Sequence, residues 1–390
     1  MPIERMIKKI HIDALRVGMF VDRYGSGSFD SPLAMFQRIV RDNNEVRMLR
    51  RSGVDWIYID TDKGVDVHES MGTYARKVAF SDEVSVAAKL YRHTLNHVHE
   101  VFARIKDGGD FNHHDSEDVV EGLVESVHRN DAAGICLTQL RGRDDYTYTH
   151  SVNVGLLSVV FGVSLGLEHA EVIRLGLAGI YHDIGKLRLP NEIIAKPGRL
   201  TPSEYRIAQT HALEGYRIMA EQADIHPDLL SAVAEHHERY DGSGYPRAIH
   251  GAGLNRFARL LSVVDVFDAL TSDRPYAKAK TPSEAFRVMY SARGKSFEPQ
   301  YVERFIKAMG IYPPGSFVRL NTGSYGVVCG SNSAQPLRPQ VKVVYDRKLR
   351  QCQSEVLDLS DFNTAQNDKV EITEALDPGE YRIDIMRLLS

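Results

Sequence analysis

Cysteine is scarce in this chain of 390 residues, in which Cys136, Cys329 and Cys352 lie far apart. Such separated thiols exclude a disulfide framework and a four-cysteine zinc site, and they favour a reducing compartment. Histidine is abundant by comparison, with 16 residues against 3 cysteines. Any metal site would therefore be built from imidazole and carboxylate rather than thiolate.

The chain also lacks a surplus of positive charge and a long apolar run. The 48 Lys+Arg against 52 Asp+Glu give a net charge of -4, which excludes a general nucleic-acid coat or a polybasic membrane binder. The most apolar stretch, 152–167, is shorter than the roughly 20 residues of a membrane span, and we interpret it as a buried core helix. No signal-peptide core follows Met1, so we expect a cytoplasmic protein.

Local patterns predict a mainly α protein of several parts. We expect a small α+β module at 1–62, a linker and helical segment at 63–140, an all-helical domain at 141–310 and a β-rich extension at 311–390. The predicted strands are Ile10–Ile12, Gly18–Val21 and Trp56–Asp60, with a helix around Val46–Arg51, and then Phe317–Leu320, Gly326–Val328 and Val341–Tyr345.

The helical domain holds a His-Asp pair at a predicted helix end. In the segment Val172–Lys186, apolar residues recur at helical spacing until His182 and Asp183, where Gly185 can end the helix. An imidazole beside a carboxylate offers a nitrogen ligand and a group able to bridge two cations. A single such pair is equally well explained as a polar helix end.

Other polar residues in the same domain favour a metal site. His236 and His237 follow an amphipathic helix, and adjacent side chains on a helix point about 100° apart, so both reach one cation only where the helix ends. Asp265 lies on an apolar helical face, where a carboxylate must be paired or bound to metal. His150 and His211 also lie on helical patterns, although either alone is more often a packed or exposed residue.

These residues together resemble a known family. The segments His182–Lys186, His236–Pro246 and Asp265–Tyr276, with His211, are similar to the HD-GYP subgroup of the HD phosphohydrolase superfamily. The resemblance covers about 149–310 and includes Gly244, Tyr245 and Pro246, which name the subgroup. Residues 1–60 are similar to a small domain often found ahead of bacterial HD-GYP domains.

The resemblance implies a phosphodiesterase that opens cyclic di-GMP to linear pGpG and often GMP in bacterial second-messenger signalling. It also implies two divalent cations, with iron or manganese as the usual metals. One cation would be held by His150, His182, Asp183 and Asp265, and the other by Asp183, His211, His236 and His237. Asp183 would therefore bridge the two.

Substrate contacts follow from the same resemblance. We expect Lys186 to contact a phosphate and Arg274 to bind the second phosphate or a guanine edge. The loop of Gly244, Tyr245 and Pro246 would shape the site or contact signalling partners. Weaker candidates, expected to be solvent-exposed, are Arg239, Lys196 and Arg199.

The chain departs from the family pattern at two positions. Tyr146 stands where some members carry a glutamate that binds a third metal, so we predict two metals. Many members carry a lysine shortly after Arg-Pro-Tyr, whereas this chain has Ala277 and then Lys278, which weakens the case for a substrate contact there. The remaining histidines that form local groups are interpreted as surface residues: His93, His97, His113 and His114.

Two alternatives to a cyclic di-GMP hydrolase stay open at this point. One is a hydrolase of another cyclic dinucleotide, such as the mixed GMP–AMP molecule. The other is a sensor or interaction module, which the presence of His182, Asp183 and Lys186 disfavours. A homodimer and the regulatory input to the N-terminal module are also left open.

Overall fold

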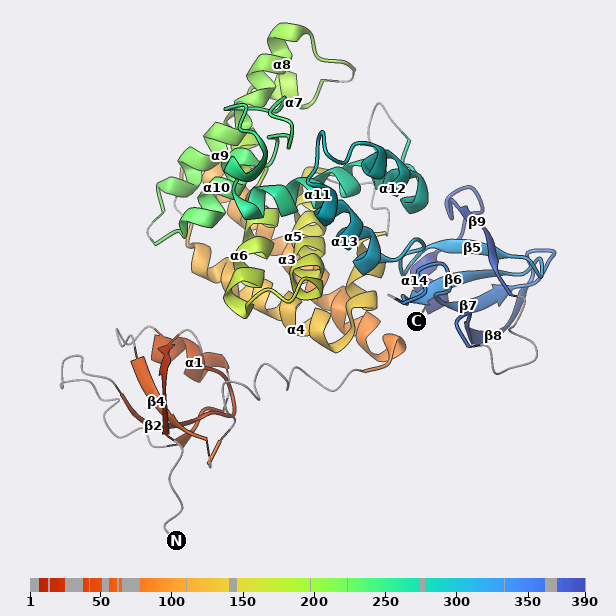
Figure 1. The fold of residues 1–390 in the computed structure, drawn as a ribbon, viewed down its shortest axis with the longest axis horizontal. Helices are drawn as coiled ribbons and strands as arrows, with labels where there is room; N and C mark the ends of the chain where they lie inside the picture. Colours follow the sequence, from red (N-terminus) through yellow and green to blue (C-terminus); the bar gives the residue numbers. More distant parts are fainter. Residues whose placement is uncertain are drawn as a thin grey trace. The chain divides into compact units, whose positions relative to one another are not determined.

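The computed structural model divides into two compact units, Met1–Arg76 and Lys77–Ser390, which we describe separately (Figure 1). The structure describes residues 7–12, 15–24, 38–41, 43–50, 56–61, 63–64, 78–109, 111–139, 146–196, 198–222, 224–273, 278–332, 334–361 and 370–389. The expected linker after residue 62 lies almost wholly outside these ranges.

In its described residues, the N-terminal unit contains a small antiparallel sheet and helix α1, as the sequence predicts for an α+β module. Its strand order is β1-β4-β2-β3, with bounds Ile7–His11 for β1, Phe20–Tyr24 for β2, Arg38–Ile39 for β3 and Trp56–Asp60 for β4. Helix α1 is Asn43–Arg50. The strand predicted from Gly18 begins only at Phe20, because Gly18 has φ 90° and lies in a turn.

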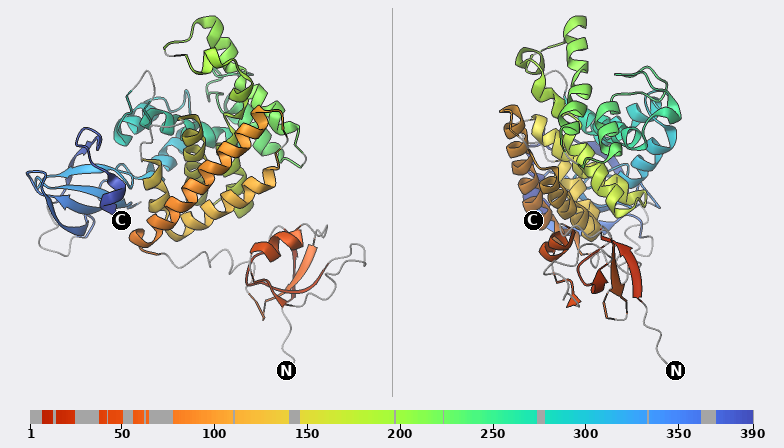
Figure 2. Two further views of the ribbon diagram at one scale, coloured as in Figure 1. Left: turned by 180° about the vertical axis from the view of Figure 1, so that it is seen from behind. Right: turned by 90° about the vertical axis from the view of Figure 1, so that its left-hand side faces the viewer.

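Long helices form the centre of the second unit (Figure 2). These are α3 (Phe80–Lys106), α4 (His113–Thr138), α5 (Tyr146–Ser164), α6 (His169–Tyr181) and α11 (Arg256–Thr271). One apolar core joins α3 and α4 to the helices that follow, so the boundary expected at residue 140 does not divide this core. Helix α5 is buried along most of its length, as predicted for its apolar sequence.

Shorter helices complete this domain around the same core. They are η3 (Ile184–Arg188), α7 (Asn191–Ile194), α8 (Pro202–Gln209), α9 (His211–Ala220), α10 (Pro227–Glu235), η4 (Gly251–Gly253), α12 (Pro282–Ser291) and α13 (Pro299–Met309). Among the described residues, no helix has both the length and the apolar character that crossing a bilayer demands.

An antiparallel sheet follows the helices, in the strand order β8-β7-β6-β5-β9. Its bounds are β5 Phe317–Leu320, β6 Tyr325–Gly330, β7 Gln340–Tyr345, β8 Gln351–Asp358 and β9 Ile372–Leu376, and helix α14 is Ile385–Leu389. Cys136 of α4 packs with Phe317 and Cys329 in one apolar cluster, which joins the sheet to the helical domain. The fold is mainly α with a small α+β module and a β-rich extension, and the predicted fold class is confirmed.

Candidate metal centre

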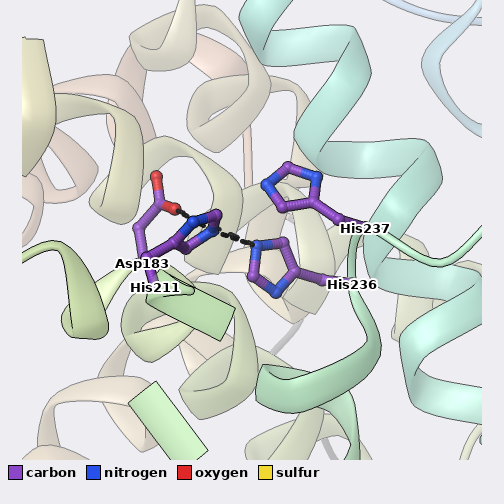
Figure 3. A group of neighbouring side chains, drawn as sticks. All are labelled: Asp183, His211, His236 and His237. Atoms are coloured by element: carbon purple, nitrogen blue, oxygen red, sulfur yellow. Dashed lines mark hydrogen bonds and ion pairs between the residues drawn. The ribbon is translucent and has the colours of Figure 1, made fainter. Parts of the chain in front are cut away.

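The ends of several helices bring the predicted ligands together in the interior. His182 follows the last residue of α6, His211 is the first residue of α9, and His236 follows the last residue of α10. Asp265 projects from the middle of α11 and His150 from α5, and all five side chains are buried, together with Asp183. Figure 3 shows Asp183, His211, His236 and His237 facing one another.

Gly185 has a different function from the helix stop that its sequence position predicts. Helix α6 ends at Tyr181, and Gly185 lies inside the following turn of 3-10 helix, η3. A Cβ atom on Gly185 would lie 1.9 Å from the carbonyl oxygen of His211 and 2.3 Å from the backbone nitrogen of Gly215. Only glycine therefore allows η3 to approach α9 closely enough to place Asp183 beside His211.

The two oxygens of Asp183 face two separate groups of imidazoles. Its Oδ2 atom lies 3.3 Å from His182 Nε2 and 3.8 Å from His150 Nε2. Its Oδ1 atom lies 3.4 Å from His211 Nε2 and 3.9 Å from His236 Nε2. One carboxylate is thus shared between two clusters of nitrogen atoms.

Each cluster has a further potential ligand. Asp265 Oδ1 lies 3.1 Å from His150 Nε2 and 3.8 Å from His182 Nε2, on the Oδ2 side of Asp183. On the other side, one ligand atom each from Asp183, His211, His236 and His237 lie within 4.8 Å of one another. The spacing in both clusters suits a cation between the side chains.

Hydrogen bonds to backbone carbonyls fix how these imidazoles are protonated. The Nδ1 atoms of His182, His211 and His236 donate to the carbonyl oxygens of Gly179, Ala208 and Val233, at 2.8, 2.6 and 2.7 Å. A carbonyl only accepts, so Nδ1 carries the proton and Nε2 of a neutral ring is left with a lone pair. The Nε2 atoms of His211 and His236 face each other at 3.2 Å. Two lone pairs at this distance repel, and a cation between them turns repulsion into ligation.

Burial keeps the imidazoles of the second cluster neutral. Desolvation, reinforced by neighbouring histidines, holds the pKa of His236 well below its ordinary value. Burial likewise lowers the pKa of His211, and it lowers the pKa of His237 to about 3. These three rings therefore offer unprotonated nitrogens at neutral pH.

The carboxylates remain ionised in spite of burial. Lys186 and His182 hold the pKa of Asp183 well below its ordinary range, although burial opposes this. The pKa of Asp265 is also depressed against burial, through its hydrogen bond with His150 and the nearby His182 imidazole. Burial opposes the charge on His150, but hydrogen bonds to Asp265 and Asp268 raise its pKa to about 9.

The donor set fits a dinuclear site for divalent transition metals. Asp183 Oδ1 is buried and accepts no hydrogen bond among the described residues, which leaves a charged oxygen directed at His211 and His236 without a donor. Leaving such an oxygen unpaired is costly, and a metal ion removes the cost. Imidazole with carboxylate suits iron, manganese or zinc better than magnesium.

Asp268 is a supporting residue to which the sequence analysis assigned no function. It accepts hydrogen bonds from His150 Nδ1 at 2.7 Å and from the side-chain amide of Asn153 at 2.8 Å. Tyr91 donates in turn to Asn153 at 2.6 Å. Asp268 lies three residues after Asp265, so both point from one side of α11, and this spacing was the available signal.

The predicted substrate residues are only partly within the described chain. The ammonium group of Lys186 pairs with Asp183 Oδ2, and 31% of the Lys186 side chain is exposed. Arg274 and Ala277 lie outside the described residues, while the side chain of Tyr146, the first residue of α5, is likewise not described. Among the weaker candidates, Arg239 and Arg199 are exposed as expected, and Lys196 pairs with Glu204 at 2.5 Å.

The loop after His237 is held against the metal centre. The ring of Tyr245 lies 4.9 Å from the ring of His237, and a Cβ on Gly244 would lie 2.3 Å from the backbone nitrogen of Arg239. Glu238 is buried and accepts from the backbone nitrogens of Arg247 and Ile249, at 2.6 and 3.1 Å. Glu238 therefore fixes the loop, a role that the sequence analysis did not assign.

The grouped histidines outside the centre differ from expectation in part. His93 and His114 are exposed as predicted. The prediction is wrong for His113, which is buried at the start of α4. His97 is partly buried because its Nε2 atom bonds to Ser116 Oγ at 2.7 Å.

The chain matches three known domain families in order. A family described as a domain of unknown function matches residues 7–115, an HD domain matches 138–301, and a KOW domain associated with the HD domain matches 317–383. The helical domain and its buried cluster are thus those of an HD-domain protein.

Comparison with individual proteins identifies the family within the HD-domain proteins. The chain is 33% identical over 97% of its length to cyclic di-GMP phosphodiesterase PA4108 of Pseudomonas aeruginosa, covering 94% of that protein. It is 39% identical over 42% of its length to a cyclic di-GMP phosphodiesterase of Thermotoga maritima, covering 45% of it. The chain belongs to the HD-GYP family.

A solved structure has a similar fold. Bd1817, an HDG"Y"P protein from Bdellovibrio bacteriovorus, aligns with 77% of this chain and 98% of its own, with a TM-score of 0.50 and 18% sequence identity. This likeness concerns the fold alone.

Proposed function

We propose that this protein is a metal-dependent phosphodiesterase that hydrolyses cyclic di-GMP to linear pGpG, with GMP as a candidate second product. The observation that carries the proposal is the division of the Asp183 carboxylate between two imidazole clusters whose Nε2 atoms point inward. The extended match to a relative named a cyclic di-GMP phosphodiesterase supports the choice of substrate.

We assign one divalent cation to His150, His182, Asp183 and Asp265, and a second to Asp183, His211, His236 and His237. Iron or manganese is the metal we expect from the mixed imidazole and carboxylate donors. A pair of bound cations supplies Lewis acidity, which lowers the pKa of water and neutralises phosphate charge. The absence of a carboxylate at Tyr146 favours two cations rather than three.

The residues around the centre supply orientation and charge. Backbone carbonyls fix the rings of His182, His211 and His236, so their Nε2 atoms require no rearrangement to bind. Lys186 has a partly exposed ammonium group beside Asp183, from which it can donate to a phosphate oxygen as negative charge increases there. Arg274 is our candidate for the second phosphate or a guanine edge.

A second candidate substrate is the mixed GMP–AMP cyclic dinucleotide. A relative named 3'3'-cGAMP-specific phosphodiesterase 3, from Vibrio cholerae, is 32% identical over 44% of this chain. The relative named for cyclic di-GMP matches along 97% of it, and we therefore rank cyclic di-GMP first. The intact set of ligands, all buried except the partly exposed His237, argues against a pure sensor module.

The proposal extends to the protein's surroundings. The loop of Gly244, Tyr245 and Pro246 is partly exposed, and we suggest it as a contact for signalling partners. A cytoplasmic location and a homodimer belong to the same proposal.

The test is a product analysis with protein reconstituted anaerobically with iron or manganese. Cyclic di-GMP and the mixed dinucleotide are supplied separately, and the products are separated by chromatography. We expect pGpG, followed by GMP, from cyclic di-GMP at the higher kcat/KM. Faster hydrolysis of the mixed dinucleotide would replace the substrate assignment, and no product from either would refute the enzyme proposal.

A further inference from the structure

A second group of metal-binding side chains lies in the first turn of α4. The Nδ1 atom of His114 lies 3.0 Å from Glu117 Oε2, and the Nε2 atom of His113 lies 4.0 Å from Glu117 Oε1. One ligand atom from each of the three residues lies within 4.8 Å of the others. We call these three residues the α4 cluster, and they share no residue with the buried metal centre.

The environment of His113 is not explained by packing alone. The side chain is only 7% exposed, yet no hydrogen bond links the ring to any residue that the structure describes. Its ring packs on that of His114, with centroids 4.0 Å apart. Burial, then the nearby His114, lowers the pKa of His113, so the ring is neutral and offers a lone pair. Neither ring nitrogen of His113 is among the fully buried polar atoms that lack a partner, so a cation held with His114 and Glu117 can reach the lone pair.

The electrostatic surroundings suit a cation. A helix N-terminus carries a partial positive charge, which by itself disfavours a metal ion. Asp115 lies in the first turn and Glu117 directly after it, and Asp224, in the chain before α10, is close enough for its charge to act on the pKa of His113. The carboxylates outweigh the half charge of the helix end.

We propose that the α4 cluster binds one zinc-class divalent ion through His113, His114 and Glu117. Two imidazoles and one carboxylate form a common donor set for Zn²⁺, and Co²⁺ binds the same donors. The i, i+3 and i, i+4 spacing of the histidines from Glu117 puts all three ligands on adjoining faces of one turn. Water completes the coordination.

The α4 cluster lies next to residues that contact the end of α6. Ser116, in the same turn, bonds to Tyr181 and lies 2.7 Å from His97 Nε2. Tyr181 directly precedes His182, a ligand of the proposed metal centre. An ion in the α4 cluster therefore holds the turn against which the end of α6 is packed.

The experiment uses the full chain carrying Asp183→Ala, a change that removes the shared ligand of the buried centre. Binding of Co²⁺ to this variant is measured by visible absorption. Binding of Zn²⁺ is measured by competition with a chromophoric chelator. We expect the Asp183→Ala chain to bind one equivalent of either ion per chain. The double variant with His114→Ala should bind none, and the double variant with Glu117→Gln should bind the ion at least tenfold more weakly. His114 is exposed and Glu117→Gln preserves shape, so neither change endangers folding.

His93→Ala in the same background is the matched control, because His93 is an exposed histidine outside the cluster. It should leave the equivalent in place. The proposal would be overturned if the Asp183→Ala chain and its double variant with His114→Ala bound the ion equally well. It would also be overturned if neither protein bound an ion. The wild-type chain and the His114→Ala single variant provide the same comparison if Asp183→Ala does not fold, with one equivalent fewer expected in His114→Ala.

Discussion

Asp183 is the residue on which both imidazole clusters depend, since each of its oxygens faces one of them. Replacing it with alanine should remove both catalytic metal ions and lower hydrolysis of cyclic di-GMP by about a thousandfold or more. Elemental analysis after purification and a product assay measure the two effects. Asp82→Asn, which changes an exposed carboxylate on α3, is the control. Two tightly bound metals in Asp183→Ala would show that the bridge is assigned wrongly.

Asp268 is hydrogen-bonded to His150, and we infer that it positions this ligand rather than contacting substrate. Asp268→Asn should weaken binding of one metal about 10- to 100-fold, because the amide no longer supports the imidazole with a full charge. The readout is the metal concentration at half-maximal activity, and kcat should recover at saturating metal. Ser272→Ala is a suitable control, because the Ser272 hydroxyl makes only a 3.4 Å contact with the same carboxylate. Unchanged metal dependence in Asp268→Asn would remove its positioning role.

Opposite pKa shifts predict that the metal-free protein is most stable near pH 6.5. Burial depresses the pKa of His211, His236 and His237 in the native protein. Below pH 6.5 these residues therefore become protonated in the unfolded chain but stay neutral in the native site, and the free energy of unfolding falls. His150 has the reverse shift, to about 9, so its contribution is complete below 6.5 and is lost as pH rises toward 9. Urea unfolding at pH 5, 6.5 and 8.5 should show losses of about 1 kcal/mol or more per pH unit on the acid side. Greater stability at pH 5 than at 6.5 would contradict these assignments.

Several of these residues could be identified from sequence and several could not. The ligands stood out because imidazoles and carboxylates at helix ends or on apolar helical faces are chemically conspicuous. Asp268 and Glu238 were missed because tertiary structure, and not sequence spacing, sets their partners. Asp268 bonds to His150, and Glu238 bonds to the backbone of Arg247 and Ile249. His113 was misjudged because the polar segment around it gives no sign that α4 is packed there.

At the scale of elements, the approach of η3 to α9 sets the geometry of the centre. Gly185→Ala should destabilise the protein by about 3 kcal/mol and weaken metal binding, because its Cβ would meet the His211 carbonyl at 1.9 Å. Thermal unfolding and metal titration measure this. Gly166→Ala is the control: its φ of +68° is strained, but a Cβ there would meet open space, so only about 1–2 kcal/mol is expected. Equal effects of the two changes would show that the close approach is unimportant.

Helices with strong apolar periodicity were predictable, and some strands were not. The sequence of β4 alternates, and its bounds agree with the prediction. Strand β8 was missed because most of its side chains are exposed, which leaves no alternation to detect. The end of α6 was misplaced because Gly185 serves packing against α9 and not helix termination.

For the molecule as a whole, the unit 77–390 should function without the N-terminal module. Among the residues that the structure describes, the core of its helical domain is formed by the unit Lys77–Ser390. A chain beginning at residue 77 should therefore fold, bind metal and hydrolyse cyclic di-GMP with a kcat within about threefold of the full chain. Circular dichroism and the product assay test this. A folded but inactive fragment would assign the N-terminal module a direct part in catalysis.

The measurement closest to the central claim is an anomalous-difference map from crystals of the manganese- or iron-loaded protein, collected on either side of the metal absorption edge. We expect two peaks in the buried cluster, one on each side of Asp183, with His150, His182 and Asp265 around one and His211, His236 and His237 around the other. A single peak there, two peaks not bridged by Asp183, or a third peak beside Tyr146 would contradict the account.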